Sequence, residues 1–303
     1  MSGPPADIAL GGLRTEQANP ASARLDSMTT RQMVDLMNAE DATVAGAVHA
    51  VLDDVARAAD RVAAALGSGG RLVYAGAGTS GRLGLLDAVE CPPTFDTDPE
   101  QVVALLAGGP GAFKQAVEGA EDDEAAGARD VDLEDLGEHD VLVGLAASGR
   151  TPYVLGALRR ARERGSATVS VACNRSAAIS HFADVAIEVD TGPEVLTGST
   201  RLKAGTAQKM VCNMLSTVAM VKIGKTYRNL MVDMRASNAK LADRAGRIVA
   251  QVSGVDTATA RAAIDAAGGS AKVAIVMLRG GLNVHDAMRR LDAAGGIVAA
   301  AID

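Results

Sequence analysis

Aromatic residues are scarce in this chain of 303 residues. Phe, Tyr and Trp together make up 2% of the sequence, and Trp is absent. Single-stranded nucleic acids are commonly bound by stacking their bases on aromatic side chains, and all nucleic acids attract positively charged surfaces. Because the chain also has a formal net charge of −7, the sequence argues against a nucleic-acid-binding protein.

Cysteine and histidine are few as well. The three cysteines, Cys91, Cys173 and Cys212, are far apart, and so are the four histidines. An odd number of scattered cysteines indicates a reducing compartment rather than a disulfide framework. No Cys or His pair has the spacing of metal ligands, so we expect no metal. We interpret Cys91 as a packing residue.

Long apolar runs are also missing. No window reaches the length of a transmembrane helix, and residues 1–20 do not combine a basic start with an apolar run. We therefore expect a cytoplasmic protein with no membrane partner. Hydrophobic residues nevertheless make up 48% of the chain, which is enough for a large core.

Short apolar runs alternate with helical patterns through most of the sequence. This alternation predicts an α/β fold with a doubly wound, mostly parallel sheet flanked by helices. Residues 1–20 are rich in Gly, Pro and polar residues, and we expect them to form a flexible tail. One domain with N-terminal helices is expected at 21–228, and a helical C-terminal region at 229–303. The expected strands are at 71–75, 102–106, 140–145, 167–172 and 185–189. A helical stretch is expected at 30–66, and a long helix at 199–223.

A glycine-rich loop follows the first expected strand. The segment 76-GAGTSG-81 has the Gly-x-Gly-x-x-Gly spacing of dinucleotide-binding loops. That fingerprint also needs an acidic residue at the end of the next strand to bind the ribose. The region 102-VVALLAGG-109 contains none, so the loop gives little support to a nucleotide site.

A second loop repeats the pattern of the first, since 144-GLAASGR-150 corresponds to 76-GAGTSGR-82. Each has Ser-Gly-Arg at a helix start, where backbone N–H groups, the helix dipole and a hydroxyl suit a phosphate. Alternatively, Ser80 and Ser148 only cap their helices. The repetition favours the first interpretation: two loops at neighbouring strand ends could hold one phosphosugar.

These loops resemble those of the sugar isomerase (SIS) domain, in which Ser and Thr hydroxyls bind the phosphate of a sugar phosphate. Thr79 and Ser80 match its first loop, and 148-SGRT-151 matches its second. The segments 76–95, 117–123, 192–209 and 229–234 are more specific. With 144–154 and the early TEQANPAS stretch, they resemble the N-acetylmuramic acid 6-phosphate etherase family over nearly the whole chain. Segment 192–209 is also shared with the glucokinase regulatory protein, a non-catalytic relative.

The resemblance implies a lyase of peptidoglycan-derived amino-sugar catabolism. It would cleave the D-lactyl ether of N-acetylmuramic acid 6-phosphate to N-acetylglucosamine 6-phosphate and D-lactate. A base would remove the C2 proton of the open-chain aldehyde, lactate would leave from C3, and water would add back. This chemistry needs no cofactor. The resemblance also implies a homodimer and a UBA-like C-terminal helical unit.

The catalytic pair implied by the resemblance is Glu90 and Glu121. We assign Glu90 as the acid that protonates the leaving lactate and Glu121 as the base, and the reverse assignment stays open. From the residues alone, Glu90 could be a solvated residue at the end of a helix terminated by Pro92 and Pro93. Glu121 could belong to the solvated face of an acidic run.

Substrate-binding residues are expected in both loops and in the segment 192–209. They are Thr79, Ser80, Arg82, Ser148, Gly149, Arg150, Thr151, Glu194, Ser199 and Lys203. Val89 stands beside the expected acid, where relatives commonly have Ser. Two other functions use the same loops: a non-catalytic sugar-phosphate sensor, and an aldose–ketose isomerase of the same fold.

Overall fold

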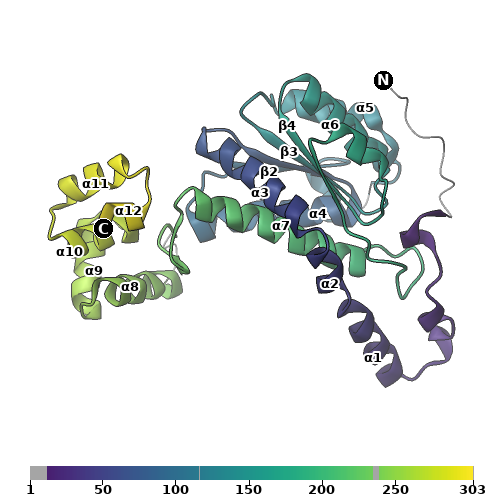
Figure 1. Ribbon diagram of the computed structural model, residues 1–303, viewed down its shortest axis with the longest axis horizontal. Coiled ribbons are helices and arrows are strands. Elements are labelled where there is room, and N and C mark those ends of the chain that lie inside the picture. Colours follow the sequence, from purple (N-terminus) through teal and green to yellow (C-terminus); the bar gives the residue numbers. More distant parts are fainter. Residues whose placement is uncertain (1–11, 116, 235–238, 303) are drawn as a thin grey trace. The chain divides into compact units, whose positions relative to one another are not determined.

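The computed structural model describes residues 12–115, 117–234 and 239–302 (Figure 1). The chain divides into two compact units. The first takes the residues up to Ala88 and Val102–Ser216, and the second takes Val89–Gln101 and the residues from Thr217 on. Among the described residues, no helix combines the length and the apolar character needed to span a bilayer.

A parallel sheet of five strands forms the centre of the first unit, in the order β2-β1-β3-β4-β5. All five expected strands are confirmed. β1 and β3 are buried along their whole length, as expected for apolar runs in a sheet covered on both faces. The strands are β1 (Leu72–Gly76), β2 (Val102–Leu106), β3 (Val141–Ala146), β4 (Ala167–Ala172) and β5 (Val185–Glu188).

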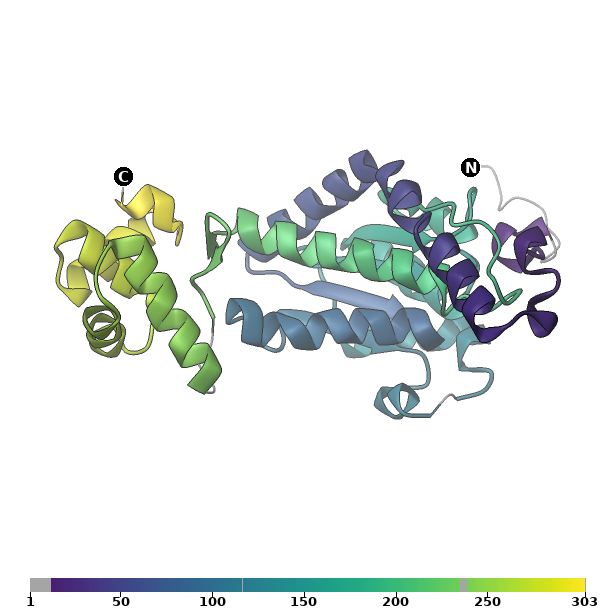
Figure 2. The ribbon, with the colours of Figure 1, turned by 90° about the horizontal axis from the view of Figure 1, so that it is seen from below.

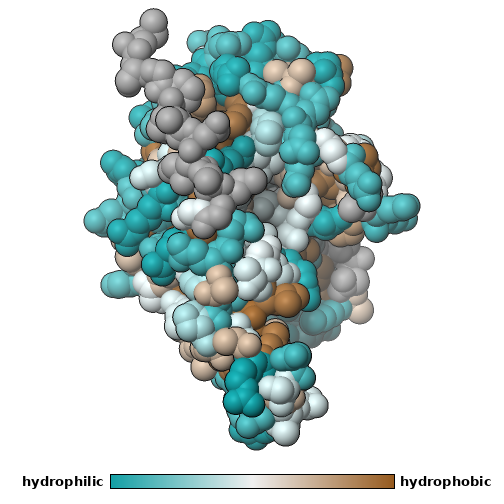
Figure 3. Space-filling view, turned by 90° about the vertical axis from the view of Figure 1, so that its right-hand side faces the viewer, coloured by the Kyte–Doolittle hydropathy of each residue, from teal (hydrophilic) through white to brown (hydrophobic). Residues whose placement is uncertain are grey.

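Helices cover both faces of this sheet. α5 and α6 lie over one face, and α3, α4 and α7 lie over the other (Figures 1 and 2). The side of the first unit seen in Figure 3 is largely hydrophilic, with small separate apolar patches. The helices are α3 (Leu52–Gly67), α4 (Gly78–Phe95), α5 (Glu124–Leu133), α6 (Pro152–Glu163) and α7 (Lys203–Lys222).

The strand order places the two Ser-Gly-Arg loops side by side. Strand order reverses between β1 and β3, which are neighbours with Gly76 opposite Leu145. The loops follow these two strands. In open parallel sheets, ligands bind beyond the carboxyl ends of the strands at such a reversal point. The topology therefore puts both loops where a ligand site is expected.

The segment before the sheet differs from the expected one. The expected helical stretch at 30–66 is divided into α1 (Thr30–Asp41), α2 (Val44–His49) and α3. Residues 1–11 of the expected tail lie outside the described residues. From residue 12 on, the chain is not loose: it forms short 3-10 turns, with Thr15 fully buried and Asn19 6% exposed.

Helix α4 corrects another expectation. Pro92 and Pro93 do not terminate it, because the helix continues to Phe95. A proline cannot donate an N–H and its ring crowds the carbonyl four residues earlier, but its own carbonyl can still accept a helical hydrogen bond. Pro92 O accepts one from Asp96 N at 3.0 Å. Asp96 then ends the helix in a left-handed conformation, with φ at 49°.

The second unit has its own apolar core. The short hairpin β6 (Thr226–Tyr227) and β7 (Leu230–Met231) precedes five helices of its described part: α8 (Ala239–Ser253), α9 (Thr257–Ala266), α10 (Ala271–Gly280), α11 (Val284–Ala293) and α12 (Val298–Ile302). Val232 and Met234 of the 229–234 segment are part of this core. Between them, Asp233 pairs with Lys272 at 2.8 Å and with Lys225 at 3.2 Å. The segment 229–234 thus joins the hairpin to the helices. The resemblance of the C-terminal helices to a UBA unit stays a prediction.

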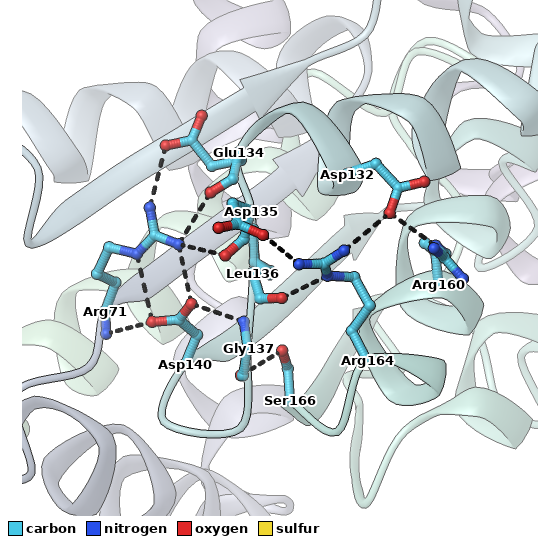
Figure 4. Close-up of polar contacts among 10 residues, drawn as sticks. All are labelled: Arg71, Asp132, Glu134, Asp135, Leu136, Gly137, Asp140, Arg160, Arg164 and Ser166. Carbon is cyan, nitrogen blue, oxygen red and sulfur yellow. Dashed lines mark hydrogen bonds and ion pairs between the residues drawn. The ribbon is translucent and has the colours of Figure 1, made fainter.

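An ionic network stabilises the amino end of the sheet (Figure 4). Asp140, which precedes β3, accepts hydrogen bonds from Arg71 N at 2.9 Å, Arg71 Nη2 at 2.9 Å and Gly137 N at 3.0 Å. Burial raises the pKa of Asp140, but the hydrogen bonds and the positive charge of Arg71 outweigh it, so its pKa lies below the ordinary 3.8. The carboxylate form of Asp140 therefore stabilises the fold.

We predict that Asp140→Asn destabilises the protein by about 2 kcal/mol or more, because the Arg71 guanidinium loses its buried counter-charge. Because the pKa of Asp140 is lower in the folded protein than in the unfolded chain, this stabilisation is present above about pH 4. It is lost as the pH falls through the pKa of Asp140 in the folded protein. The measurement is urea unfolding of both proteins between pH 3 and 7. The two stability curves should converge toward the acidic end.

Asp132→Asn is the matched control. Asp132 belongs to the same network through Arg160 and Arg164, but its side chain is 42% exposed. Solvent screens such pairs, so the loss should be clearly smaller. Equal losses for the two variants would contradict the assignment of the stabilising role to Asp140.

Candidate active site

The first loop joins β1 to α4 by a very close approach of strand and helix. A Cβ atom on Gly76 would lie 2.7 Å from Gly81 N, and one on Gly81 would lie 2.5 Å from Gly76 O. Both positions therefore require glycine. The Gly-x-Gly-x-x-Gly spacing reflects this packing of the strand end against the first turn of the helix, and a dinucleotide is not needed to account for it.

Ser80 connects this loop to α7. Ser80 is only 7% exposed. Its hydroxyl donates to Gln208 Oε1 at 2.9 Å. Gln208 is 1% exposed, and its Nε2 has no hydrogen-bond partner among the described residues. A buried donor without a partner is costly, so it requires an explanation. Thr79, next to Ser80, is half-buried.

The second loop joins β3 to α6. Gly149 has φ at 74°, and a Cβ atom there would lie 2.4 Å from Ala177 Cβ. Ser148 Oγ accepts from Arg150 N at 3.2 Å, which turns the backbone at the start of the loop. Ser148, Arg150 and Thr151 are half-buried, so their side chains keep partial access to solvent.

Asn174, at the carboxyl end of β4, holds the second loop and the N-terminal segment together. Its Nδ2 donates to Ala147 O at 3.1 Å and to Thr15 Oγ1 at 2.9 Å, and its Oδ1 accepts from Thr15 N at 3.3 Å. Asn19 Nδ2 in turn donates to Pro193 O at 3.4 Å. The early TEQANPAS stretch thus binds the edge of the sheet where the loops lie. Asn174 was missed from the sequence, although a polar residue just after an expected strand is a usable signal.

Glu194 and Lys203 both have structural partners. Glu194 is fully buried, and its two oxygens accept from Lys203 N and Ala204 N, each at 3.0 Å. This carboxylate therefore caps α7. Lys203 Nζ pairs with Glu40 Oε2 at 2.5 Å, and this hydrogen bond is the main cause that lowers the pKa of Glu40. A substrate-binding role for either residue stays a prediction.

The expected long helix begins later than predicted, at Lys203 rather than at residue 199. Ser199 lies in the turn before it, where its N–H donates to Leu196 O at 2.9 Å. Its side chain is half-buried, and its contact with a substrate also stays a prediction.

A cavity of about 200 Å³ opens beside the first loop. Glu121, in the short turn Ala120–Asp122, is exposed and lines this cavity. The acidic run is therefore not only a solvated face. The lining residues come from the first loop, from the start of α4 and from the segment after β2: Ala77, Gly78, Arg82, Ala107, Ala112, Val117, Glu118, Gly119, Ala120 and Glu121.

Glu90 lies on α4 and is exposed. It is five residues before the end of this helix rather than at the end itself. Glu90 belongs to the second compact unit and Glu121 to the first, so the pairing of the two glutamates stays a prediction. Val89, which precedes Glu90, is 56% exposed. Cys91, which follows Glu90, is buried, as expected for a packing residue.

Asp87 is a further carboxyl group on α4 that the sequence did not reveal. Its oxygens accept from the Tyr74 hydroxyl at 2.8 Å and from the Ser216 hydroxyl at 3.1 Å. Burial raises the pKa of Asp87, although the two hydrogen bonds act against it. A single Asp in a helical pattern is usually a surface residue, which is why no sequence signal pointed to it.

Comparisons with known proteins agree with this geometry. The family model of the glucokinase regulatory protein N-terminal SIS domain matches residues 54–162, and the SIS domain model matches residues 119–218. The chain is 59% identical to N-acetylmuramic acid 6-phosphate etherase from Mycolicibacterium smegmatis, over 97% of this chain and 98% of that one. The chain belongs to the N-acetylmuramic acid 6-phosphate etherase family.

Other members of the etherase family are nearly as similar. The enzyme of that name from Serratia proteamaculans is 54% identical over 97% of this chain and 99% of its own. Among solved structures, the phosphoheptose isomerase GmhA from Neisseria gonorrhoeae covers 63% of this chain and 98% of its own at 19% identity, with a TM-score of 0.49.

The geometry of the second loop makes a testable prediction for this family member. Gly149→Ala should lower the free energy of unfolding by about 2 kcal/mol or more, because backbone strain and the overlap with Ala177 add together. Gly119→Ala is the matched control, since Gly119 has nearly the same φ, at 72°, in the left-handed region, and nothing within 4 Å of its added Cβ. It should cost only the backbone strain, about 1 kcal/mol. Urea unfolding measures both, and equal losses would contradict the tight packing of Gly149.

Proposed function

We propose that this protein is a lyase that cleaves the D-lactyl ether of N-acetylmuramic acid 6-phosphate. The products are N-acetylglucosamine 6-phosphate and D-lactate, which places the reaction in amino-sugar catabolism. The observation that carries the proposal is the 59% identity to an etherase over 97% of the chain. The twin loops at the reversal point of the sheet support it, because they suit a sugar phosphate.

The phosphate would bind between the two loops. Backbone N–H groups at the starts of α4 and α6 and the hydroxyls of Thr79, Ser148 and Thr151 would donate to it. Ser80, whose hydroxyl donates to Gln208, would line the pocket. The buried Nε2 of Gln208, beside Ser80, supports a polar ligand in this region. Arg150 would add a positive charge. Ser199 and the segment around Glu194 would shape the sugar side of the pocket.

The reaction would proceed by elimination and addition. In the open-chain aldehyde, the carbonyl acidifies the C2 proton, which Glu121 would remove. Glu90 would protonate the ether oxygen as the C3–O bond breaks, and it would then help water add to the resulting double bond. Glu121 lines the cavity beside the phosphate loop, which supports its role as the base. The opposite division of the two roles gives the same products.

The other proposed properties are a homodimer and a cytoplasmic location. Exposed aliphatic side chains on α4 and α7 support self-association: Leu86 and Val89 on the first helix, and Val218 and Val221 on the second. A non-catalytic sensor of sugar phosphates is the alternative function, because the glucokinase regulatory protein domain model matches residues 54–162.

We predict that the purified protein releases one D-lactate per N-acetylmuramic acid 6-phosphate, measured with D-lactate dehydrogenase. Glu90→Gln should bind the sugar phosphate with nearly unchanged affinity but turn over at least 10²-fold more slowly, because it removes acid catalysis. Isothermal titration calorimetry measures the binding. Binding without any lactate release by the wild type would favour the sensor, and normal turnover by Glu90→Gln would refute the assignment of Glu90.

The bond that breaks can be tested with isotopes. Elimination predicts that, in D₂O, the product carries deuterium at C2. In H₂¹⁸O, the label should enter the C3 hydroxyl of the sugar and not the lactate, because the C3–O bond is cleaved. Mass spectrometry of both products measures this. Label in the lactate would contradict the mechanism while leaving the overall activity intact.

A further inference from the structure

Arg82 makes two hydrogen bonds that its place in the first loop does not predict. Its Nε donates to Phe113 O at 3.0 Å, and its Nη2 donates to Ala112 O at 2.8 Å. The two carbonyls are consecutive and lie in the short turn Pro110–Phe113. The rigid, planar fork of an arginine is suited to bridging two acceptors at once, which a lysine ammonium does not reproduce.

The residues held by Arg82 belong to the segment that carries Glu121. We call the described residues 107–115 and 117–123 the Glu121 segment. It is anchored at one end by Ala107 N, which donates to Gly76 O at 3.0 Å, and at the other by Asp123, whose Oδ1 accepts from Ala126 N at 2.8 Å. Arg82 binds it between these two anchors.

Little apolar packing fixes the middle of this segment. Phe113 and Val117 are 47% and 50% exposed, whereas Ala112 is buried. Gly108 and Gly119 have φ at 86° and 72°, so the segment turns at glycines, which adopt many backbone conformations at low cost. Its position therefore depends strongly on polar contacts, of which those of Arg82 are two.

We propose that Arg82 is a positioning residue that holds the Glu121 segment beside the phosphate loop, and not a ligand of the phosphate. Arg82 and Glu121 line the same cavity. Arg82 is two residues after Ser80 on α4, so its guanidinium ties the base to the loop that binds the phosphate. The inference rests on the proposed function for its catalytic consequence, but the contact itself can be tested without activity.

Kinetics separate the two roles. The variants are Arg82→Ala and Arg82→Lys, and the readouts are kcat for D-lactate release and the inhibition constant of inorganic phosphate. A positioning role predicts that kcat falls at least 10-fold in both variants, because a displacement of about 1 Å can cost 10²-fold. The inhibition constant of phosphate should change less than 3-fold. If Arg82 were a phosphate ligand, Arg82→Ala would raise that constant at least 10-fold, and Arg82→Lys, which keeps the charge, would restore most of the binding.

Arg150→Ala is the matched control, since Arg150 occupies the corresponding place in the second loop. It should raise the inhibition constant of phosphate where Arg82→Ala does not. Guanidinium ion at millimolar concentration should restore part of the kcat of Arg82→Ala by occupying the vacated place, and it should not affect Arg150→Ala in the same way. No rescue together with a raised phosphate inhibition constant would overturn the proposal.

Proteolysis tests the contact independently of activity. The chain has three Phe residues, of which Phe95 is buried, Phe182 is half-buried and Phe113 is exposed. Chymotrypsin should cut after Phe113 at least 5-fold faster in Arg82→Ala than in the wild type, as followed by mass spectrometry of the fragments. Unchanged cleavage would refute the positioning role. An inactive wild type with faster cleavage in the variant would refute the proposed function and not the contact.

Discussion

The parallel pairing of β1 with β3 is the constraint on which the site depends. Because Gly76 is opposite Leu145 in this register, the two Ser-Gly-Arg loops leave the sheet at the same edge and at similar height. The reversal of strand order there leaves room beyond the strand ends that no crossover helix fills. Two short glycine loops can then converge on one ligand, although 68 residues separate them in the sequence.

The two edges of the sheet are built in opposite ways. At the amino edge, Asp140 uses both of its oxygens on Arg71 and Gly137. At the carboxyl edge, the buried Nε2 of Gln208 has no partner in the described part of the chain. An unpaired buried donor costs about 1–3 kcal/mol. Local rules of stability are broken mainly where function requires it, and this is also the edge at which the two Ser-Gly-Arg loops leave the sheet.

The sheet could be predicted from the sequence because its signals are local. A short apolar run bounded by glycines specifies a buried strand without reference to distant residues. The segment around Thr15 could not be predicted in this way. Its composition is typical of a loose tail, but its hydrogen bonds reach Asn174, 159 residues further along the chain. The end of α4 was also predicted wrongly. The expectation that Pro92 ends the helix considers the missing N–H of proline and not its carbonyl, which still accepts a hydrogen bond from Asp96 N.

The location of the site was easier to predict from the sequence than the role of each residue. The type of a charged residue does not show whether its side chain binds a ligand or a backbone group. Lys203 pairs with Glu40, 163 residues away, and Glu194 caps the helix that Lys203 begins. These residues make their contacts inside the protein and stabilise the chain at the carboxyl edge of the sheet. Glu121 is exposed beside the cavity instead. A base must reach its substrate and give up its proton afterwards, so an exposed carboxylate in an acidic run is compatible with catalysis, provided that other residues fix where it stands.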